Sequence, residues 1–287
     1  MTTLQTNLEK YRPLLASLDV ELILAHVLKK SREFVLAHPE SQLTKNQEIK
    51  VTQLIVRRLR HEPLAYIFGQ KEFYGLNFLV TRDTLIPRPE TEMLVEKTLQ
   101  IVAKNKTTWL NIIDVGTGSG NIIIAVAKNS RKRKINYFGV DISKKALAVA
   151  KHNARKYKLT KKINFLQGNL LAPLKKNIFC KNTNTLIIAN LPYLSSKIYR
   201  ATALNVKNYE PKSALYSPAS GLAHYEKLLK QIKLLNTGHN ISTAILEISP
   251  EQKPTIKLLA LKYLPDAQID FQRDLAGKWR ICEIKLA

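Results

Sequence analysis

An asparagine that follows an apolar run is the residue of this sequence best suited to chemistry. Residues 187–189 read Ile-Ile-Ala, as in a buried strand, and the chain continues with Asn190, Leu191, Pro192 and Tyr193. An Asn side chain offers one carbonyl acceptor and two N–H donors, and a backbone carbonyl beside it adds a second acceptor. Two acceptors can hold both hydrogens of a planar NH2 group, in an amide or an exocyclic amine. We therefore predict a site that turns the lone pair of such a nitrogen toward an electrophile.

A glycine-rich turn upstream is suited to hold the ligand that carries the electrophile. An apolar strand predicted over residues 110–115 leads into Gly-Thr-Gly-Ser-Gly at 116–120 and then into a helical pattern over 121–128. Glycine permits close approach of the backbone to a ligand, and the helix N-terminus beyond it favours a carboxylate. The dinucleotide fingerprint requires a third glycine three residues after the second, but Asn121 occupies that position. The spacing therefore disfavours an NAD site.

An acid follows the next predicted strand. Residues 135–140 are apolar and end at Asp141, where a carboxylate can accept hydrogen bonds from the ribose hydroxyls of a nucleoside. The turn and this acid together predict a nucleoside without a pyrophosphate.

The combination of these features resembles the class I S-adenosylmethionine-dependent methyltransferases, and flanking segments narrow the resemblance. Residues 62–67 (Glu-Pro-Leu-Ala-Tyr-Ile), 73–75 (Phe-Tyr-Gly), 85–92 (Leu-Ile-Pro-Arg-Pro-Glu-Thr-Glu), 209–211 (Tyr-Glu-Pro) and 274–277 (Asp-Leu-Ala-Gly) look like the signature of the HemK/PrmC family. The similarity extends from about Glu21 to Glu283. Members of this family are protein-(glutamine-N5) methyltransferases that modify class I peptide chain release factors.

The resemblance implies a cofactor, a substrate and the residues that bind them. The cofactor is S-adenosyl-L-methionine, which leaves as S-adenosyl-L-homocysteine, and the substrate is the glutamine of the Gly-Gly-Gln loop of a release factor. Methyl transfer to the amide nitrogen is expected to be direct, with no metal. The implied cofactor-binding residues are Asp114, Gly116, Thr117, Gly118, Gly120, Asp141, Asn169 and Asn190. The implied catalytic residues are Asn190, Leu191, Pro192 and Tyr193, and the same four bind the substrate together with Phe73, Arg88 and Glu90.

Two positions depart from the family pattern. The family usually has Asn-Pro-Pro-Tyr, whereas this chain has Leu191, which keeps a backbone carbonyl but loses the fixed φ of proline. Asn169 stands where an acid commonly faces the adenine amine. The Leu variant is also similar to the motif of the rRNA adenine-N6 dimethyltransferases. The alternatives are therefore an N6-adenine methyltransferase of rRNA or DNA and a catalytically idle RNA-binding or ribosome-binding protein.

Each of these residues also has a purely structural interpretation. The glycines can form a plain tight turn, Asp141 can cap a helix that begins near Ser143, and Asn190 can be a turn residue before proline. Arg88 and Glu90 can be surface charges. Tyr193 and Phe73 can be ordinary core residues.

Composition bounds the remaining possibilities. The 287 residues are 45% hydrophobic, with 46 Lys and Arg against 22 Asp and Glu, a net charge of +24. This charge favours weak nonspecific association with RNA or the ribosome, although an even abundance of Lys throughout the chain is the simpler explanation. The two cysteines, Cys180 and Cys282, have no ligand spacing, the start is polar, and no apolar stretch approaches 18 residues. We expect a reduced cytoplasmic monomer that does not enter a membrane.

These residues require a scaffold that brings strand ends together. Residues 1–62 are predicted to form a helical bundle, which the resemblance implies to bind the release factor. Apolar residues recur there at helical spacing, as at Leu14, Leu18, Leu22, Leu43, Val51, Leu54 and Ile55. Residues 63–86 are predicted to form a β-hairpin linker, and residues 87–287 the methyltransferase domain. The last is expected to be a Rossmann-like, doubly wound α/β sheet of seven strands, at 110–115, 135–140, 163–167, 185–189, 242–248, 268–273 and 280–286, the last antiparallel.

Overall fold

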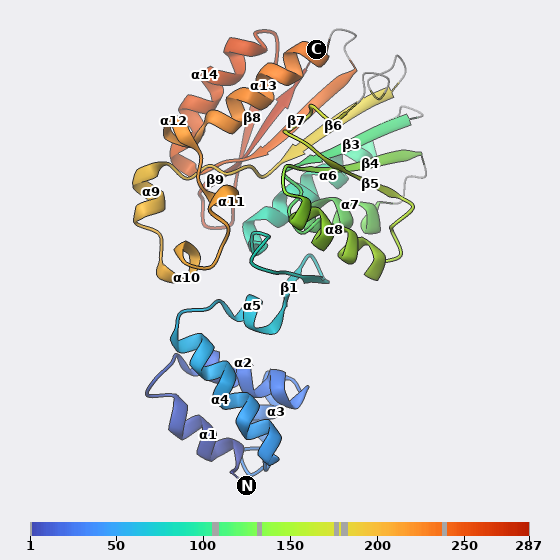
Figure 1. Ribbon diagram of the computed structural model, residues 1–287. Coiled ribbons are helices and arrows are strands. Elements are labelled where there is room, and N and C mark those ends of the chain that lie inside the picture. The colour runs from blue at the N-terminus through green and yellow to red at the C-terminus, as the bar shows by residue number, and fades with distance from the viewer. Residues whose placement is uncertain are drawn as a thin grey trace. The chain divides into compact units, whose positions relative to one another are not determined.

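The computed structural model describes two compact units (Figure 1). Unit 1 comprises Met1–Gly69 and Ala203–Tyr209, and unit 2 comprises Gln70–Thr202 and Glu210–Ala287. The described residues are 2–104, 109–130, 134–174, 178, 183–236 and 240–286, so Cys180 lies outside them. Within these ranges no helix has the length and apolarity needed to cross a membrane.

Unit 1 is a bundle of short helices. They are α1 (Leu4–Tyr11), α2 (Ser17–Leu28), α3 (Arg32–Ala37), α4 (Lys45–Leu59), α5 (Leu64–Phe68) and α10 (Leu204–Lys207). Thr44 begins α4 with a capping box, in which its side chain accepts from the Gln47 N–H while the Gln47 side chain accepts from the Thr44 N–H. Such reciprocal bonds satisfy two backbone donors at the helix start. The helical prediction for residues 1–62 thus agrees with the helices found there.

Only some of the apolar residues at helical spacing are packed inside this bundle. Leu43, Val51, Leu54 and Ile55 are buried, whereas Leu14 and Leu18 are 57% and 49% exposed. Leu14 lies beyond the end of α1, because the chain breaks at Pro13, and in α2 the buried side chains include Val20, Ile23 and Leu24. The face of a helix with apolar residues on several sides is decided by its neighbours, which the spacing alone does not reveal.

The predicted hairpin over residues 63–86 is correct only in its middle. Residues 64–68 form helix α5, which ends at Gly69 in the left-handed region (φ 69°). The hairpin is limited to β1 (Gln70–Phe73) and β2 (Leu76–Leu79), paired antiparallel. Tyr74 and Gly75 connect them with φ of 52° and 70°, as in the two-residue turns that match the strand twist. A short apolar run such as residues 64–68 does not distinguish helix from strand.

Unit 2 is built on a seven-stranded sheet. The strands are β3 (Trp109–Val115), β4 (Ile135–Asp141), β5 (Ile163–Gln167), β6 (Thr183–Ala189), β7 (Ile241–Glu247), β8 (Gln268–Arg273) and β9 (Trp279–Lys285). Their order is β5-β4-β3-β6-β7-β9-β8, and β9 runs antiparallel to both β7 and β8. The predicted doubly wound fold, its seven strands and its antiparallel last strand are confirmed, with strand ends shifted by at most two residues.

Helices cover both faces of this sheet (Figure 1). On one face α6 (Glu92–Lys104), α7 (Asn121–Asn129) and α8 (Lys144–Lys156) contribute to one hydrophobic cluster, and on the other α13 (Ala223–Leu235) and α14 (Lys253–Tyr263) contribute to a second. Short helices lie in the connections: η1 (Pro89–Thr91), α9 (Ser196–Arg200), α11 (Lys212–Leu215), α12 (Pro218–Gly221) and η3 (Pro250–Gln252). With both faces packed, the carboxyl ends of the parallel strands are the natural place for a site.

Candidate functional site

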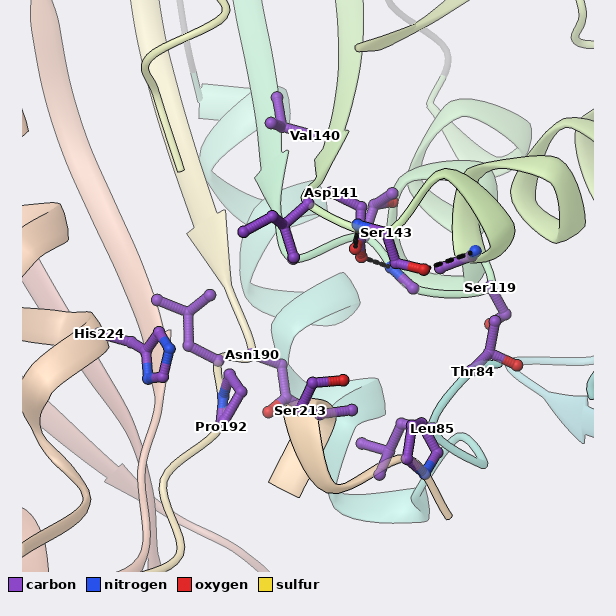
Figure 2. Close-up of a pocket in the computed structure, with 18 of the residues that line it drawn as sticks. Thr84, Leu85, Ser119, Val140, Asp141, Ser143, Asn190, Pro192, Ser213 and His224 are labelled. Carbon is purple, nitrogen blue, oxygen red and sulfur yellow. Dashed lines mark hydrogen bonds between the residues drawn. The ribbon is translucent and has the colours of Figure 1, made fainter. Parts of the chain in front are cut away.

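A pocket of about 330 Å³ lies at the carboxyl ends of the parallel strands of unit 2 (Figure 2). Ligand pockets are roughly 300–1,000 Å³, so it has the size of a small-molecule site. One side, which we call the strand-end wall, consists of residues 116–119, 140–143, 168–170 and 190–192, which follow β3, β4, β5 and β6. The opposite side, the loop wall, consists of lining residues within 83–91 and 211–227.

The glycine turn after β3 brings backbone close to this pocket. Gly116 has φ 77°, and a Cβ there would lie 3.0 Å from Leu191 Cδ2. The N–H groups of Gly116 and Thr117 donate to the Val140 carbonyl, which fixes the turn to the end of β4. Gly120 does not line the pocket; a Cβ there would meet Ile124 and Ala150, so its small size serves the packing of α7.

Asp141 joins the turn to the start of α8. Its Oδ2 accepts from the Gly118 N–H at 2.9 Å and its Oδ1 accepts from the Ser143 N–H at 2.8 Å (Figure 2). The N-cap of α8 is Ser143, whose side chain accepts from the Ala146 N–H. Burial raises the pKa of the Asp141 carboxyl, and the N–H donors oppose that shift. Because each carboxylate oxygen can accept more than one hydrogen bond, Asp141 keeps acceptor capacity toward the pocket that it lines.

Asn190 is half-buried at the end of β6, and both hydrogens of its amide are engaged within the protein. Its Nδ2 donates to Thr91 Oγ1 at 3.1 Å and to Glu247 Oε2 at 2.9 Å. Glu247 is the last residue of β7 and is 2% exposed, and burial raises the pKa of its carboxyl to about 7. With both N–H groups consumed, Oδ1 is the polar atom that the side chain has left to offer.

The loop after Asn190 is held in place although Leu191 replaces a proline. The Leu191 side chain is buried in a hydrophobic core cluster that also contains Tyr225, whose hydroxyl donates to the backbone carbonyl of Glu247. Gln252 Nε2 donates to the Tyr193 carbonyl at 3.2 Å. This chain therefore fixes the loop by the packing of Leu191 and by the Gln252 hydrogen bond, in place of the ring constraint of a proline. The carbonyl of Leu191 is not used by these contacts.

Five of the predicted site residues do not line the pocket. Phe73 is fully packed in the core against Phe78. The Tyr193 ring packs against the other core cluster, and burial raises its pKa. Glu90 lies 3.8 Å from the Arg280 guanidinium. Gly120 and Asp114 complete this group; Asp114 Oδ2 accepts from the Thr117 hydroxyl at 2.7 Å beneath the turn. The nine that line it are Arg88, Gly116, Thr117, Gly118, Asp141, Asn169, Asn190, Leu191 and Pro192.

The loop wall contains most of the residues that the sequence did not suggest. Thr84, Leu85, Ser213 and His224 are among them (Figure 2). His224 Nδ1 is 2.8 Å from the Ser217 hydroxyl, and burial lowers the pKa of its imidazole. Nothing in the spacing of these residues marks them. Glu247 did carry a signal, because a lone acid ends an otherwise apolar strand there, as Asp141 does after β4.

The loop wall is held by a buried acid. Glu210 is 5% exposed, and its carboxylate accepts from the Arg88 guanidinium and from the Ile86 N–H. Arg88 and Ile86 precede Glu210 in the sequence by 122 and 124 positions, so these bonds connect distant parts of the chain. Arg88 therefore reaches the pocket as a paired cation.

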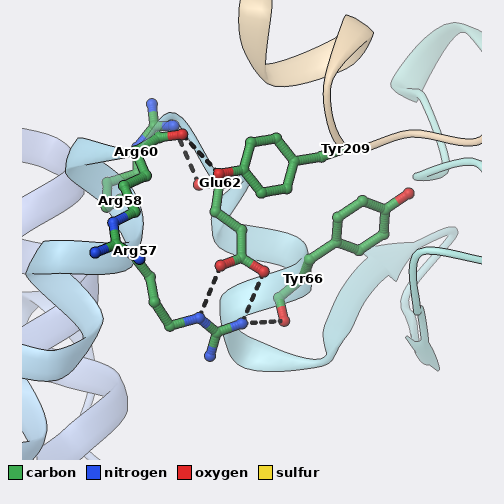
Figure 3. A network of polar contacts seen from close by, with 6 residues as sticks. All are labelled: Arg57, Arg58, Arg60, Glu62, Tyr66 and Tyr209. Carbon is green, nitrogen blue, oxygen red and sulfur yellow. Dashed lines mark hydrogen bonds and ion pairs between the residues drawn. The ribbon is translucent and has the colours of Figure 1, made fainter.

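The segment just before Glu210 belongs to unit 1, contrary to the predicted unbroken domain over residues 87–287. The Tyr209 hydroxyl donates to the Arg60 carbonyl at 2.6 Å (Figure 3). Beside it the Arg57 guanidinium binds both oxygens of Glu62, at 2.8 and 2.9 Å, and reaches the Tyr66 carbonyl. The chain thus leaves unit 2 after Thr202 and returns at Glu210.

Comparisons with known proteins agree with this architecture. Residues 6–69 match the model of the PrmC N-terminal domain, and residues 106–248 match that of a methyltransferase domain. A release factor glutamine methyltransferase of Coxiella burnetii is 38% identical over 92% of this chain and 90% of its own length. One of Dictyoglomus turgidum is 36% identical over 98% of this chain and 95% of its own length.

Solved structures show the same fold. The catalytic domain of hMettl16 in complex with an RNA hairpin has a TM-score of 0.59 and 10% identity, covering 92% of this chain and 91% of that chain. At this identity the likeness concerns the fold alone, which is that of the class I methyltransferases. The sequence matches establish the family as well as the fold, because they extend over more than nine tenths of the chain at 36–38% identity: the chain belongs to the family of release factor glutamine methyltransferases.

Proposed function

We propose that this protein methylates the side-chain amide nitrogen of the glutamine in the Gly-Gly-Gln loop of class I release factors. The observation that carries the proposal is the Asn190 amide, whose two hydrogens bind Thr91 and Glu247. Its Oδ1 is left as an acceptor in a pocket that also contains the glycine turn and Asp141. An acceptor at this point suits a substrate nitrogen that carries hydrogens.

The residues of the strand-end wall fit S-adenosyl-L-methionine. When bound, this cofactor supplies an electrophilic methyl group on a sulfonium centre. We propose that Gly116 and Gly118 let the backbone approach it, that Asp141 accepts from its ribose hydroxyls, and that Asn169 accepts from its adenine amine. Asp114 acts indirectly, by holding the Thr117 hydroxyl and so the turn. Gly120 also acts indirectly, through the packing of α7.

Asn190 and Leu191 orient the substrate amide in this proposal. Asn190 Oδ1 and the Leu191 carbonyl each accept one N–H of the glutamine NH2 group, which directs the nitrogen lone pair. Alignment of reacting groups can supply about 7–11 kcal/mol of the barrier reduction. The nitrogen would form one bond to the methyl carbon as the bond from that carbon to sulfur breaks, with the electron pair leaving on the sulfur of S-adenosyl-L-homocysteine, and the nitrogen would lose one proton to water. Tyr193 supports the loop from the core, and Pro192 and Arg88 line the substrate side.

Unit 1 and the net charge have roles in the same proposal. We propose that unit 1 binds the release factor and that the protein acts as a cytoplasmic monomer. A charge of +24 attracts acidic partners over a range set by the ionic strength. RNA association is expected to be weak and nonspecific.

Mass spectrometry of methylated substrates tests the proposal. The purified protein is incubated with labelled S-adenosylmethionine and a release factor, its loop Gln→Ala variant, rRNA or duplex DNA. Label on the loop glutamine alone is expected, with Asn190→Ala lowering kcat by about 100-fold and leaving cofactor affinity near that of the wild type. Asn164→Ala, at an exposed position on β5, is the matched control. Label on adenine would replace the glutamine assignment with nucleic-acid methylation.

A further inference from the structure

We infer that Glu247 and Thr91 are positioning residues that hold the Asn190 amide in one of its two orientations, with Oδ1 toward the substrate; the inference rests on the proposed role of Asn190. An Asn amide has nearly the same shape when rotated by 180°, with N–H groups in place of the oxygen. Only the orientation with Oδ1 toward the substrate accepts hydrogen bonds from a substrate nitrogen. In the other orientation the N–H groups of Asn190 would face the N–H groups of the substrate.

The hydrogen-bond roles around Asn190 distinguish these orientations. Asn190 Nδ2 donates to Glu247 Oε2 at 2.9 Å and to Thr91 Oγ1 at 3.1 Å. The Thr91 hydroxyl accepts one N–H here but is also a donor, whereas an ionised Glu247 carboxylate can only accept from Asn190. An inverted amide would therefore place Oδ1 against the Glu247 carboxylate oxygen and would leave its own N–H groups without that acceptor.

Stability alone does not explain why a carboxylate occupies position 247. Its side chain is buried, and among the described residues no cation lies within ion-pair distance of it. A buried ionised group without a partner is costly, and glutamine would fill the same space without a charge. A glutamine, however, offers both a donor and an acceptor, and would tolerate either orientation of Asn190. The carboxylate is the group that enforces one.

Protonation is expected to release this constraint. Glu247 is surrounded by charged and titratable groups of η1, the segments after β6 and before η1, α13 and β9: Arg88, Glu90, Tyr193, Tyr225 and Arg280. Burial outweighs the two arginines and raises the pKa of the carboxyl to about 7. Below that pH the carboxyl carries a proton that it can donate to an inverted Asn190. The competent orientation is therefore fully populated only above pH 7.

Kinetics of Glu247→Gln test the inference. We expect kcat to fall by about 10- to 100-fold, with unchanged affinity for S-adenosylhomocysteine. The kcat of the wild type should rise with pH through an apparent pKa near 7, and this rise should be absent in the variant. Glu283→Gln is the control, because Glu283 is also a buried sheet residue but pairs with Lys97, away from the pocket. A variant with the rate and pH profile of the wild type would overturn the inference.

Nuclear magnetic resonance of the Asn190 side-chain amide separates this inference from the proposed function. The signals are assigned by their loss in Asn190→Ala and need no substrate. We expect slow hydrogen exchange at pH 8, a shift on titration near pH 7, and faster exchange in both Glu247→Gln and Thr91→Val. Thr91→Val and the titration of the wild type keep the test decisive if Glu247→Gln does not fold. If the chemical shift and exchange rate of this amide change neither with pH nor in the two variants, the positioning role is refuted, even if glutamine methylation is observed.

Discussion

The two walls of the pocket are held in place by different means. In the strand-end wall, backbone groups at the ends of adjacent strands bind one another directly, as when Gly116 and Thr117 donate to Val140. In the loop wall, buried side chains from distant parts of the chain do this work. Glu210 binds Ile86 and Arg88, and Gln252 binds the Gly221 carbonyl while also binding the Tyr193 carbonyl just beyond the strand-end wall.

This difference predicts how far damage spreads from each wall. A strand end remains in its sheet when one contact is lost, because the rest of the ladder still fixes the backbone. A loop that depends on a few buried side chains has no other contacts to fix its backbone. A buried partner left without its hydrogen bond also costs about 1–3 kcal/mol. Substitutions in the loop wall should therefore affect stability and activity together, whereas those in the strand-end wall should affect ligand binding alone.

The strongest test of the loop wall is Gly221→Ala. Gly221 has φ 90°, and a Cβ there would lie 2.0 Å from the Tyr193 carbonyl oxygen, so the backbone of the loop wall at Gly221 must move away from it. We expect the free energy of unfolding to fall by about 3 kcal/mol or more and methylation to be lost. Chemical denaturation and the methylation assay measure the two effects.

Gly277→Ala is the matched control for that experiment. Gly277 also has a left-handed φ of 75°, but nothing lies within 4 Å of its Cβ position. Only the backbone conformation is penalised there, by about 1–2 kcal/mol, and methylation should persist. Equal losses in the two variants would show that crowding at Gly221 is unimportant and that the loop wall is not specially sensitive.

Asp141→Asn tests the strand-end wall with a smaller expected effect. The amide keeps one acceptor oxygen but loses the charge and one of the two acceptors that now bind Gly118 and Ser143. Because hydrogen bonds to charged groups contribute about 1.5–3 kcal/mol, we expect cofactor affinity to fall by about 10- to 100-fold in calorimetric titration. The melting temperature of the unliganded protein should change little. Asp266→Asn, at an exposed position before β8, should leave affinity unchanged; an Asp141→Asn protein that unfolds like Gly221→Ala would remove the distinction between the walls.

The same division explains what the sequence could predict. The turn at Gly116, Asp141 and Asn190 each follow an apolar strand directly, so local pattern and the rule that sites gather at strand ends were sufficient. Glu210 holds the loop wall through bonds to Ile86 and Arg88, which lie 124 and 122 positions away, and residue spacing does not reveal such contacts. His224 lines the pocket from the start of α13, and no local pattern marks it. Phe73 was assigned to the substrate by resemblance, but a fully packed ring has no surface to offer.

The predicted division of the chain failed for a related reason. Hydrophobic periodicity shows that residues form a helix but not which neighbours cover it. Leu14 follows the helical spacing but is exposed, and the segment 203–209 was placed in the methyltransferase domain because it lies within that domain in sequence. Its Tyr209 hydroxyl instead binds Arg60 in unit 1.

Asp114→Asn should have the smallest effect, since Asp114 supports the strand-end wall from below without lining the pocket. Among the described residues its Oδ1 has no hydrogen-bond partner, and burial raises the pKa of its carboxyl to about 7. An acid whose pKa is higher in the folded state makes the native protein bind more protons than the unfolded chain, so its contribution to stability falls as pH rises from about 4 to 7. Asparagine does not titrate and still accepts from Thr117. Chemical denaturation at pH 6 and pH 8 should therefore show that the free energy of unfolding of the variant, relative to that of the wild type, rises by about 1 kcal/mol between the two pH values. A difference independent of pH would mean that Asp114 ionises normally in the folded protein, and that the turn is held by a charge.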